Sequence, residues 1–151
     1  MSESDSHRPI NKHLAEIELR IYDAIKFENF EMFKDLGGTE QIDLNFRIEI
    51  DRNTSYYPIQ LASTKGSTEM VAAILSNPSL DINIQDPESG INSFWLAAYF
   101  GHGDIMQLLA EAGIDVLNKH SVTKSNALHV AVERNHPHIV RMLIKSGFPI
   151  D

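Results

Sequence analysis

The stretch NSFWLAAYFGHGDIMQLLAEAGIDVLN at residues 92–118 is followed, at residues 125–151, by SNALHVAVERNHPHIVRMLIKSGFPID, which repeats its pattern. A third copy, YPIQLASTKGSTEMVAAIL, occupies residues 57–75. The small residue at the centre of each copy is Ala62, Ala97 or Ala131. Because recurrence at a period of about 35 residues is typical of repeat architectures, we expect an array of similar units.

The apolar residues within each copy have helical spacing. In the copy around Ala97 they fall at Ile105–Met106 and again at Leu109–Ala110, and the other copies repeat these distances. Four residues after the alanine comes a residue type that tolerates a left-handed turn, namely Gly66, Gly101 or Asn135. Each copy therefore predicts two short helices joined at this turn.

A fainter copy lies upstream, where Ala24 is followed at the same distances by Met32–Phe33 and by Leu36. Between the helix pairs the sequence is rich in Asp, Asn, Gly and Ser, which favour extended turns. A single helical hairpin cannot bury both of its faces. We therefore expect four hairpins, linked by β-hairpin-like loops, to stack into an all-α solenoid.

These units resemble ankyrin repeats, and the most specific pieces are NALHVAV at 126–132, LAAYFGHGDIMQLLAEAGID at 96–115 and YPIQLASTKG at 57–66. Tetratricopeptide repeats have a similar period, but their Trp-Leu-Gly-Tyr-Ala-Phe-Pro pattern is not found here. The resemblance places a flexible polar tail at 1–13 and an ankyrin-repeat domain at 14–151, with repeats at roughly 14–46, 50–83, 86–118 and 121–151. It implies inner helices near Leu19–Phe27, Pro58–Lys65, Ser93–Phe100 and Ala127–Arg134.

The chain departs from the family pattern at three kinds of position. Pro58 alone keeps the proline that starts the inner helix, although Asn92 and Asn126 can act as N-caps. The motif histidine is present as His129, but Gln60 and Trp95 replace it in the preceding copies, so the usual hydrogen bonds between repeats are in question there. The largest insertion relative to the family pattern lies inside FRIEIDRNTSYYP at 46–58 and predicts an elongated first finger.

Composition excludes several classes of function. The 151 residues are 42% hydrophobic and 23% charged, as in an ordinary globular protein. With no cysteine, the chain has no disulfide, thiolate metal site or cysteine nucleophile.

A formal net charge of −8 argues against nucleic-acid binding. No apolar run of about 18 residues and no secretory signal is found, so we expect no membrane insertion and an intracellular, cytoplasmic location.

No catalytic, metal or cofactor site is expected. The acidic candidates for acid–base chemistry are not placed by the repeat pattern in a common cleft; they are Asp23, Asp104, Asp115 and Glu133. His129, His136 and His138 have the short spacing of metal ligands. However, His102 and His136 both follow the turn residue, where ankyrin repeats usually carry a histidine for a structural hydrogen bond.

The resemblance also implies a binding surface, because the two residues after the paired alanines usually face the concave groove. That register selects Lys26–Phe27, Thr64–Lys65, Tyr99–Phe100 and Glu133–Arg134, and we add Tyr56 of the elongated finger. Exposed aromatic rings there are typical of anchors for a partner, unless a neighbouring finger covers them. The adjacent cations favour an acidic or extended peptide segment. Trp95 fits either an anchor or packing between repeats.

The predicted function is that of a non-enzymatic protein–protein interaction module. The alternative is an N-terminal recognition or regulatory segment of a larger enzyme, channel or scaffold protein. The segment LSNPSLDIN at 75–83 also resembles the context in which ankyrin asparagines are hydroxylated, which makes Asn83 a candidate modification site.

The two ends of the array differ in pattern. The last outer helix keeps an apolar face like an internal one, with Ile139, Val140, Met142, Leu143 and Ile144. This predicts further repeats after Asp151, or association that covers this face. The first unit instead has Leu14, Ile17, Ile21 and Ile25 along one side and charged residues elsewhere, as in a cap.

Overall fold

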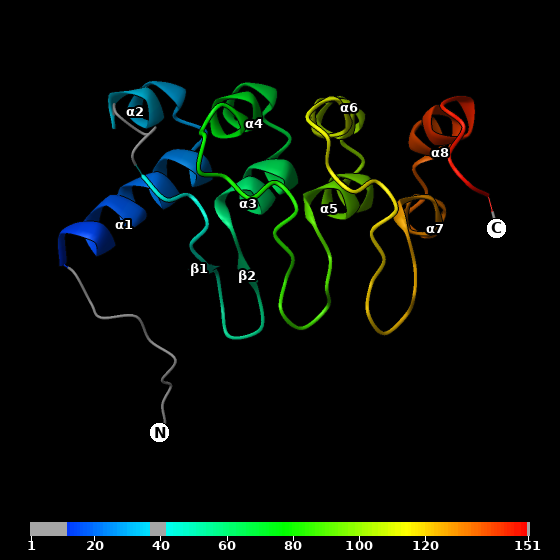
Figure 1. Cartoon of the computed structure of the whole chain (residues 1–151), viewed down its shortest axis with the longest axis horizontal. Coiled ribbons are helices and arrows are strands. Elements are labelled where there is room, and N and C mark those ends of the chain that lie inside the picture. Colours follow the sequence, from blue (N-terminus) through cyan, green and yellow to red (C-terminus); the bar gives the residue numbers. More distant parts are fainter. Residues whose placement is uncertain (1–11, 37–41, 151) are drawn as a thin grey trace.

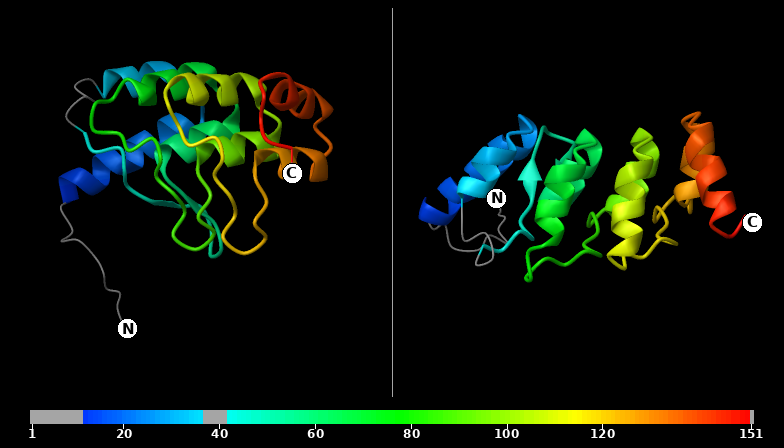
Figure 2. Two further views of the ribbon diagram at one scale, coloured as in Figure 1. Left: turned by 45° about the vertical axis from the view of Figure 1, so that its right-hand side comes forward. Right: turned by 90° about the horizontal axis from the view of Figure 1, so that it is seen from above.

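The computed structural model describes residues 12–36 and 42–150, and these residues form a row of four helical hairpins (Figure 1). The hairpins consist of α1 (Lys12–Lys26) with α2 (Phe30–Asp35), α3 (Pro58–Lys65) with α4 (Thr68–Leu75), α5 (Ser93–Phe100) with α6 (Gly103–Glu111), and α7 (Ala127–Glu133) with α8 (Pro137–Lys145). The inner helices α1, α3, α5 and α7 form one layer and the outer helices form a second (Figure 2). The predicted all-α solenoid is confirmed.

Helix α1 differs from its prediction in length. It begins at Lys12, seven residues before the expected start at Leu19, because its apolar spacing continues upstream through Ile17. Lys12 and His13 therefore belong to the helix and not to the tail. The rest of the tail, residues 1–11, lies outside the described residues. Helices α3 and α5 have the expected bounds, and α7 ends one residue earlier than expected.

The turns within the hairpins have the predicted backbone conformation. Gly66, Gly101 and Asn135 have φ of 77°, 79° and 60°. The predicted N-caps also form: Asn92 Oδ1 accepts from the main-chain N–H of Trp95 at 3.1 Å, and Asn126 Oδ1 accepts from that of His129 at 3.0 Å.

Loops project as fingers from the inner-helix layer (Figure 1). The first finger contains the antiparallel strands β1 (Ile48–Glu49) and β2 (Ser55–Tyr56), with Ile48 opposite Tyr56. Its predicted elongation is not seen in Figure 1, where the three fingers project to a similar depth. Each strand has only two residues, so the strand content is as small as expected.

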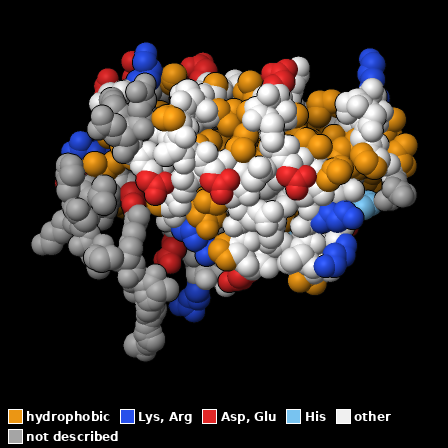
Figure 3. All heavy atoms as spheres, in the orientation of Figure 1, with side chains coloured by type: hydrophobic (Ala, Val, Ile, Leu, Met, Phe, Trp, Pro, Cys, Tyr) orange, Lys and Arg blue, Asp and Glu red, His pale blue; other side chains and the backbone are white. Residues whose placement is uncertain are grey.

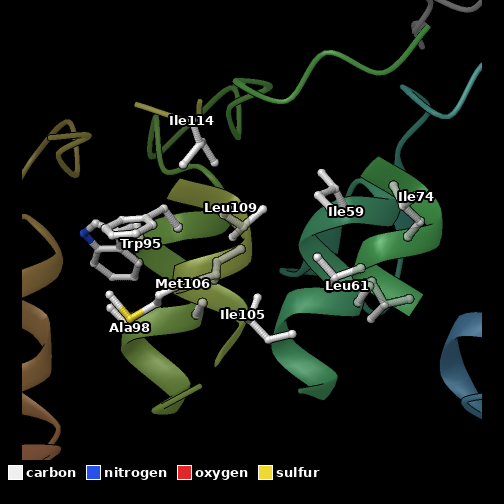
Figure 4. Packing of buried hydrophobic residues seen from close by; sticks show 14 of the residues in the cluster. Ile59, Leu61, Ile74, Trp95, Ala98, Ile105, Met106, Leu109 and Ile114 are labelled. Atoms are coloured by element: carbon white, nitrogen blue, oxygen red, sulfur yellow. The ribbon is translucent and has the colours of Figure 1, made fainter. Parts of the chain in front are cut away.

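The hydrophobic core runs through the whole stack and lies both within and between hairpins. Ile59 of α3, Met106 of α6 and Ile105 of α6 are almost completely buried. Figure 4 shows Ile105 pointing toward the second hairpin. Since each hairpin completes its core on its neighbour, stacking supplies the burial that a single hairpin lacks.

Side-chain hydrogen bonds also join the units. Gln60 Nε2 donates to the carbonyl of Ile91 at 3.1 Å, and Trp95 Nε1 donates to that of Ser125 at 3.0 Å. Both acceptors immediately precede the next inner helix's N-cap. The doubt about hydrogen bonds in the middle of the stack was therefore wrong, because a glutamine amide and an indole replace the histidine donor.

Candidate functional site

The predicted groove positions lie at the C-terminal ends of the four inner helices. Lys26 and Lys65 are the last residues of α1 and α3, Phe100 is the last residue of α5, and Arg134 is the C-cap of α7. Successive inner helices pack side by side, so these ends follow one another along the stack (Figures 1 and 2).

Five planar groups are in contact with one another, and we call them the aromatic column. The Cζ of Arg134 lies 4.5 Å from the ring centroid of Tyr99, whose ring is stacked on Trp95 at 5.6 Å. The Trp95 ring in turn lies 6.0 Å from that of His120 in the third finger. Phe100 meets Tyr99 edge to face at 4.9 Å. The column thus joins residues from α5, the third finger and the fourth hairpin.

The column changes two expectations about exposure. Tyr99 is only partly exposed, although its register predicts an exposed ring, because Trp95 stacks on the ring and the guanidinium of Arg134 lies over it. Trp95 is 8% exposed and serves mainly in packing between hairpins. Phe100 remains 42% exposed, so the column presents one apolar ring to a partner.

Tyr56 of β2 is the finger residue associated with this surface. Burial raises the pKa of the Tyr56 hydroxyl, and the proximity of Tyr99, Asp51 and Asp86 raises it further. Tyr56 lines the space between the first and second fingers, together with Ile91 and Leu96. Neither tyrosine hydroxyl makes a hydrogen bond with a described residue.

The N-terminal end of the row has its own exposed ring. Phe27 is 69% exposed, and the Nζ of Lys26 lies 5.3 Å from its centroid and 5.6 Å from that of Tyr22. Between this pair and the column lie Thr64 and Lys65. Thr64 contributes little to a free surface, because its hydroxyl donates to the carbonyl of Leu61 within α3 at 2.7 Å. Lys65 is exposed.

A cleft of about 980 Å³ lies between the first and second fingers and extends to Gln60 of α3. At its wall, Arg47 Nη2 lies 3.5 Å from Asp86 Oδ1. Burial alone would raise the pKa of Asp86, but hydrogen bonds from Ser89 and the main-chain N–H of Glu88, together with the charge of Arg47, lower it below its usual value. The ion pair therefore fixes the two fingers relative to each other.

Three aspartates at equivalent positions recur along another face of the molecule. The equivalent aspartates Asp43, Asp81 and Asp115 are all exposed, and Figure 3 shows acidic side chains spaced along the face that carries the loops. The ends of the inner helices carry Lys26, Lys65 and Arg134 instead. The charge of the surface is therefore unevenly distributed.

The candidate catalytic carboxylates are exposed and lie on different elements: Asp23 on α1, Asp104 on α6, Asp115 after α6 and Glu133 on α7. His136 and His138 each donate from Nε2 to a carbonyl of the third hairpin, at 2.9 and 3.1 Å. Within the described ranges, no three His, Cys, Asp or Glu side chains are grouped so that they could hold a metal ion. Nor, among these residues, does any helix have the length and apolar character needed to cross a membrane.

Asn83, the candidate hydroxylation site, is exposed but structurally engaged. Its Oδ1 accepts from the main-chain N–H of Asp115 at 2.8 Å, and Asn45 Oδ1 accepts from Asp81 in the same way. Asn83 therefore joins the second and third units.

Residues 21–120 and 59–151 each match the family model described as ankyrin repeats in three copies. The chain belongs to the ankyrin-repeat family. Ankyrin repeats generally act as protein–protein interaction modules. No curated protein is similar enough in sequence to be reported as a relative.

Within this ankyrin array, sequence reasoning missed His120. It lies in a finger, outside the helical periodicity that selected the other positions, and only packing brings it against Trp95. The sequence alone carried no signal for this contact, because it depends on the path of the finger.

Proposed function

We propose that this ankyrin domain is a non-enzymatic interaction module that binds a segment of a partner protein along the inner-helix ends and the adjoining finger cleft. The observation that carries the proposal is the pair of exposed rings at the inner-helix ends: Phe27 lies beside Lys26, and Phe100 contacts Tyr99, over whose ring Arg134 lies. Exposed rings of this size are typical of interface anchors.

Charge favours an acidic, extended segment as the ligand. The molecule has a net charge of −8, yet Lys26, Lys65 and Arg134 occupy three of the four inner-helix ends. None of the three makes an ion pair with a described residue. An acidic segment would be attracted to this row and repelled by the aspartates elsewhere.

A second role is recognition within a larger enzyme, channel or scaffold protein. It is favoured by the apolar end of the fourth hairpin, where a hollow of about 710 Å³ is lined in part by Leu128, Val132, Val140 and Ile144. At the equivalent position one unit earlier, Ala98 is completely buried by the next hairpin. We propose that further repeats or an associated protein cover this end.

We also propose that the protein acts in the cytoplasm. In that compartment, we propose, Asn83 is hydroxylated.

The groove proposal is tested with affinity-purified partners and the single variants Phe27→Ala and Phe100→Ala. Each should weaken binding by more than about 1 kcal/mol, because anchors of this kind contribute that much. The matched control is Gln107→Ala on the exposed side of α6, which should leave affinity unchanged. Equal affinity for all three variants would exclude the groove.

A further inference from the structure

The aromatic column ends in a cation that lies over an aromatic ring. Arg134 lies over the Tyr99 ring and makes no ion pair with the described residues, whereas Arg47 pairs with Asp86 and Arg20 with Glu16. A guanidinium stacked on a ring keeps its N–H groups free at the edge and has already lost part of its conformational freedom. It can therefore bind a planar anion such as a carboxylate through two parallel hydrogen bonds.

The neighbours of Arg134 are those that a carboxylate ligand requires. The hydroxyl of Tyr99, over whose ring Arg134 lies, makes no hydrogen bond with a described residue, so it can donate one to a ligand. Phe100 offers an apolar surface directly beside Tyr99. Glu133 is adjacent in sequence but forms no ion pair with Arg134, so it leaves the guanidinium free.

On the basis of the proposed function, we propose that Arg134 and Tyr99 form a subsite for one acidic side chain, Asp or Glu, of the bound segment. A large apolar residue next to this acidic residue packs on Phe100. The occupant is thus an extended segment of a partner protein with an acidic–apolar pair. The remaining cations, Lys65 and Lys26, accommodate further acidic residues toward the first hairpin.

The probe is a displayed library of random 12-residue peptides, selected on the full chain, with affinities then measured by titration of the synthetic peptides. Enriched peptides should share Asp or Glu beside a large apolar residue. Arg134→Gln should weaken their binding at least tenfold, and replacing the acidic residue of the peptide by its amide should have the same effect. The two losses should not add, because they remove the same interaction.

Arg134 also packs against the aromatic column, so a loss of binding in its variants could come from damage to the column. Reversing the charges of residue 134 and of the peptide residue distinguishes such damage from loss of direct recognition. Arg134→Glu should reject the acidic peptide and regain binding to the same peptide with Lys at that position. A disrupted column would reject both peptides, and that result would overturn the subsite. Stronger binding of a phosphorylated peptide, with no binding of the Glu peptide, would overturn the assignment to a carboxylate.

Other outcomes separate this inference from the function on which it rests. Peptides that depend on Phe27 and Phe100 but are indifferent to Arg134→Gln would exclude the subsite and leave the groove. Peptides that bind equally to Phe27→Ala, Phe100→Ala and the original chain would overturn the proposal that segments bind along the inner-helix ends. A selection in which no peptide is enriched would overturn it as well.

Discussion

Ser93 is the first residue of α5 and occupies the position where ankyrin repeats usually have proline. Its side chain is completely buried, and its hydroxyl is the only buried side-chain polar atom of the described residues without a hydrogen-bond partner. The first main-chain N–H groups of a helix have no partner within that helix. Replacing Ser93 by proline would therefore remove no hydrogen bond within the helix. It would also remove a hydroxyl that makes no hydrogen bond with the described residues.

Ser93→Pro should therefore raise the free energy of unfolding by about 0.4–1 kcal/mol, because proline restricts the unfolded chain. Asn92 is extended, with ψ of −177°, as a residue before proline must be. Pro58 already occupies this position in α3. Ser93→Ala is the control in urea denaturation, since it removes the hydroxyl without restricting the backbone. A proline variant less stable than the alanine variant would contradict the prediction.

Gly101 combines a left-handed backbone with close packing. Its φ is 79°, and an added Cβ would lie 2.8 Å from His136 Cε1. Gly113 has φ of 92° but nothing within 4 Å of such an atom. Gly113→Ala should cost about 1 kcal/mol from backbone strain alone, and Gly101→Ala should cost at least about twice as much. Thermal unfolding of both variants measures the difference, and equal costs would show that His136 moves aside freely.

At the level of elements, the first two fingers are joined by a partly buried ion pair. Asp86 accepts three hydrogen bonds from Glu88 and Ser89 of its own loop and pairs with Arg47 of the first finger. The conformation of the second finger is therefore stabilised by the ionised form of the Asp86 carboxylate.

The lowered pKa of Asp86 gives this dependence a direction. Folding favours the ionised carboxylate, so its contribution is complete above the ordinary pKa of about 3.9 and is lost as pH falls through the lowered value. Asp86→Asn should reduce the free energy of unfolding by about 1 kcal/mol at pH 7 and by clearly less at about pH 3. Glu88→Gln, an exposed change in the same loop, is the control. If the loss of unfolding free energy in Asp86→Asn were larger at about pH 3 than at pH 7, the ionised Asp86 carboxylate would not be the stabilising form.

On the scale of the whole molecule, equivalent residues have different environments because not every described hairpin has another described hairpin packed on each side. Ala98 and Val132 occupy the same register, yet Ala98 is completely buried and Val132 is 62% exposed. The fourth hairpin covers the third, and no described residue covers the fourth in this way.

This difference predicts opposite effects of the same substitution. Ala98→Lys should reduce the free energy of unfolding by more than about 3 kcal/mol, because it buries an unpaired charge. In the isolated chain of 151 residues, without the proposed further repeats or associated protein, Val132→Lys should change it by no more than about 0.5 kcal/mol, as is usual on a surface. Chemical denaturation of the two variants makes the comparison. A severe loss in Val132→Lys would mean that the end is covered in solution.

Much of the fold could be predicted because the repeats reinforce one another. The bounds of α3 and α5 follow from turn glycines and the residues before each helix, which act locally. The length of α1 could not be obtained in this way, because the family pattern stops where the apolar spacing of this chain continues.

The candidate site was less predictable, since it depends on contacts distant in sequence. The register correctly indicated exposure of Phe27 and Phe100. It did not indicate that Arg134, from the following unit, would cover Tyr99, or that His120 would pack against Trp95. Such contacts are set by the stacking of units, which helical periodicity within one unit does not describe.

The histidine bonds between turns also bear on how the stack responds to mechanical force. His102 and His136 fasten the turn side of their units to the preceding hairpin, through the carbonyls of Thr64 and Tyr99, but Ser67 occupies this place in the second unit. The loop side of that first junction is held by Asn45 and by neighbouring bonds. Under tension, we expect the first hairpin to swing open at its turn side and pivot about its loop side, before the later junctions yield.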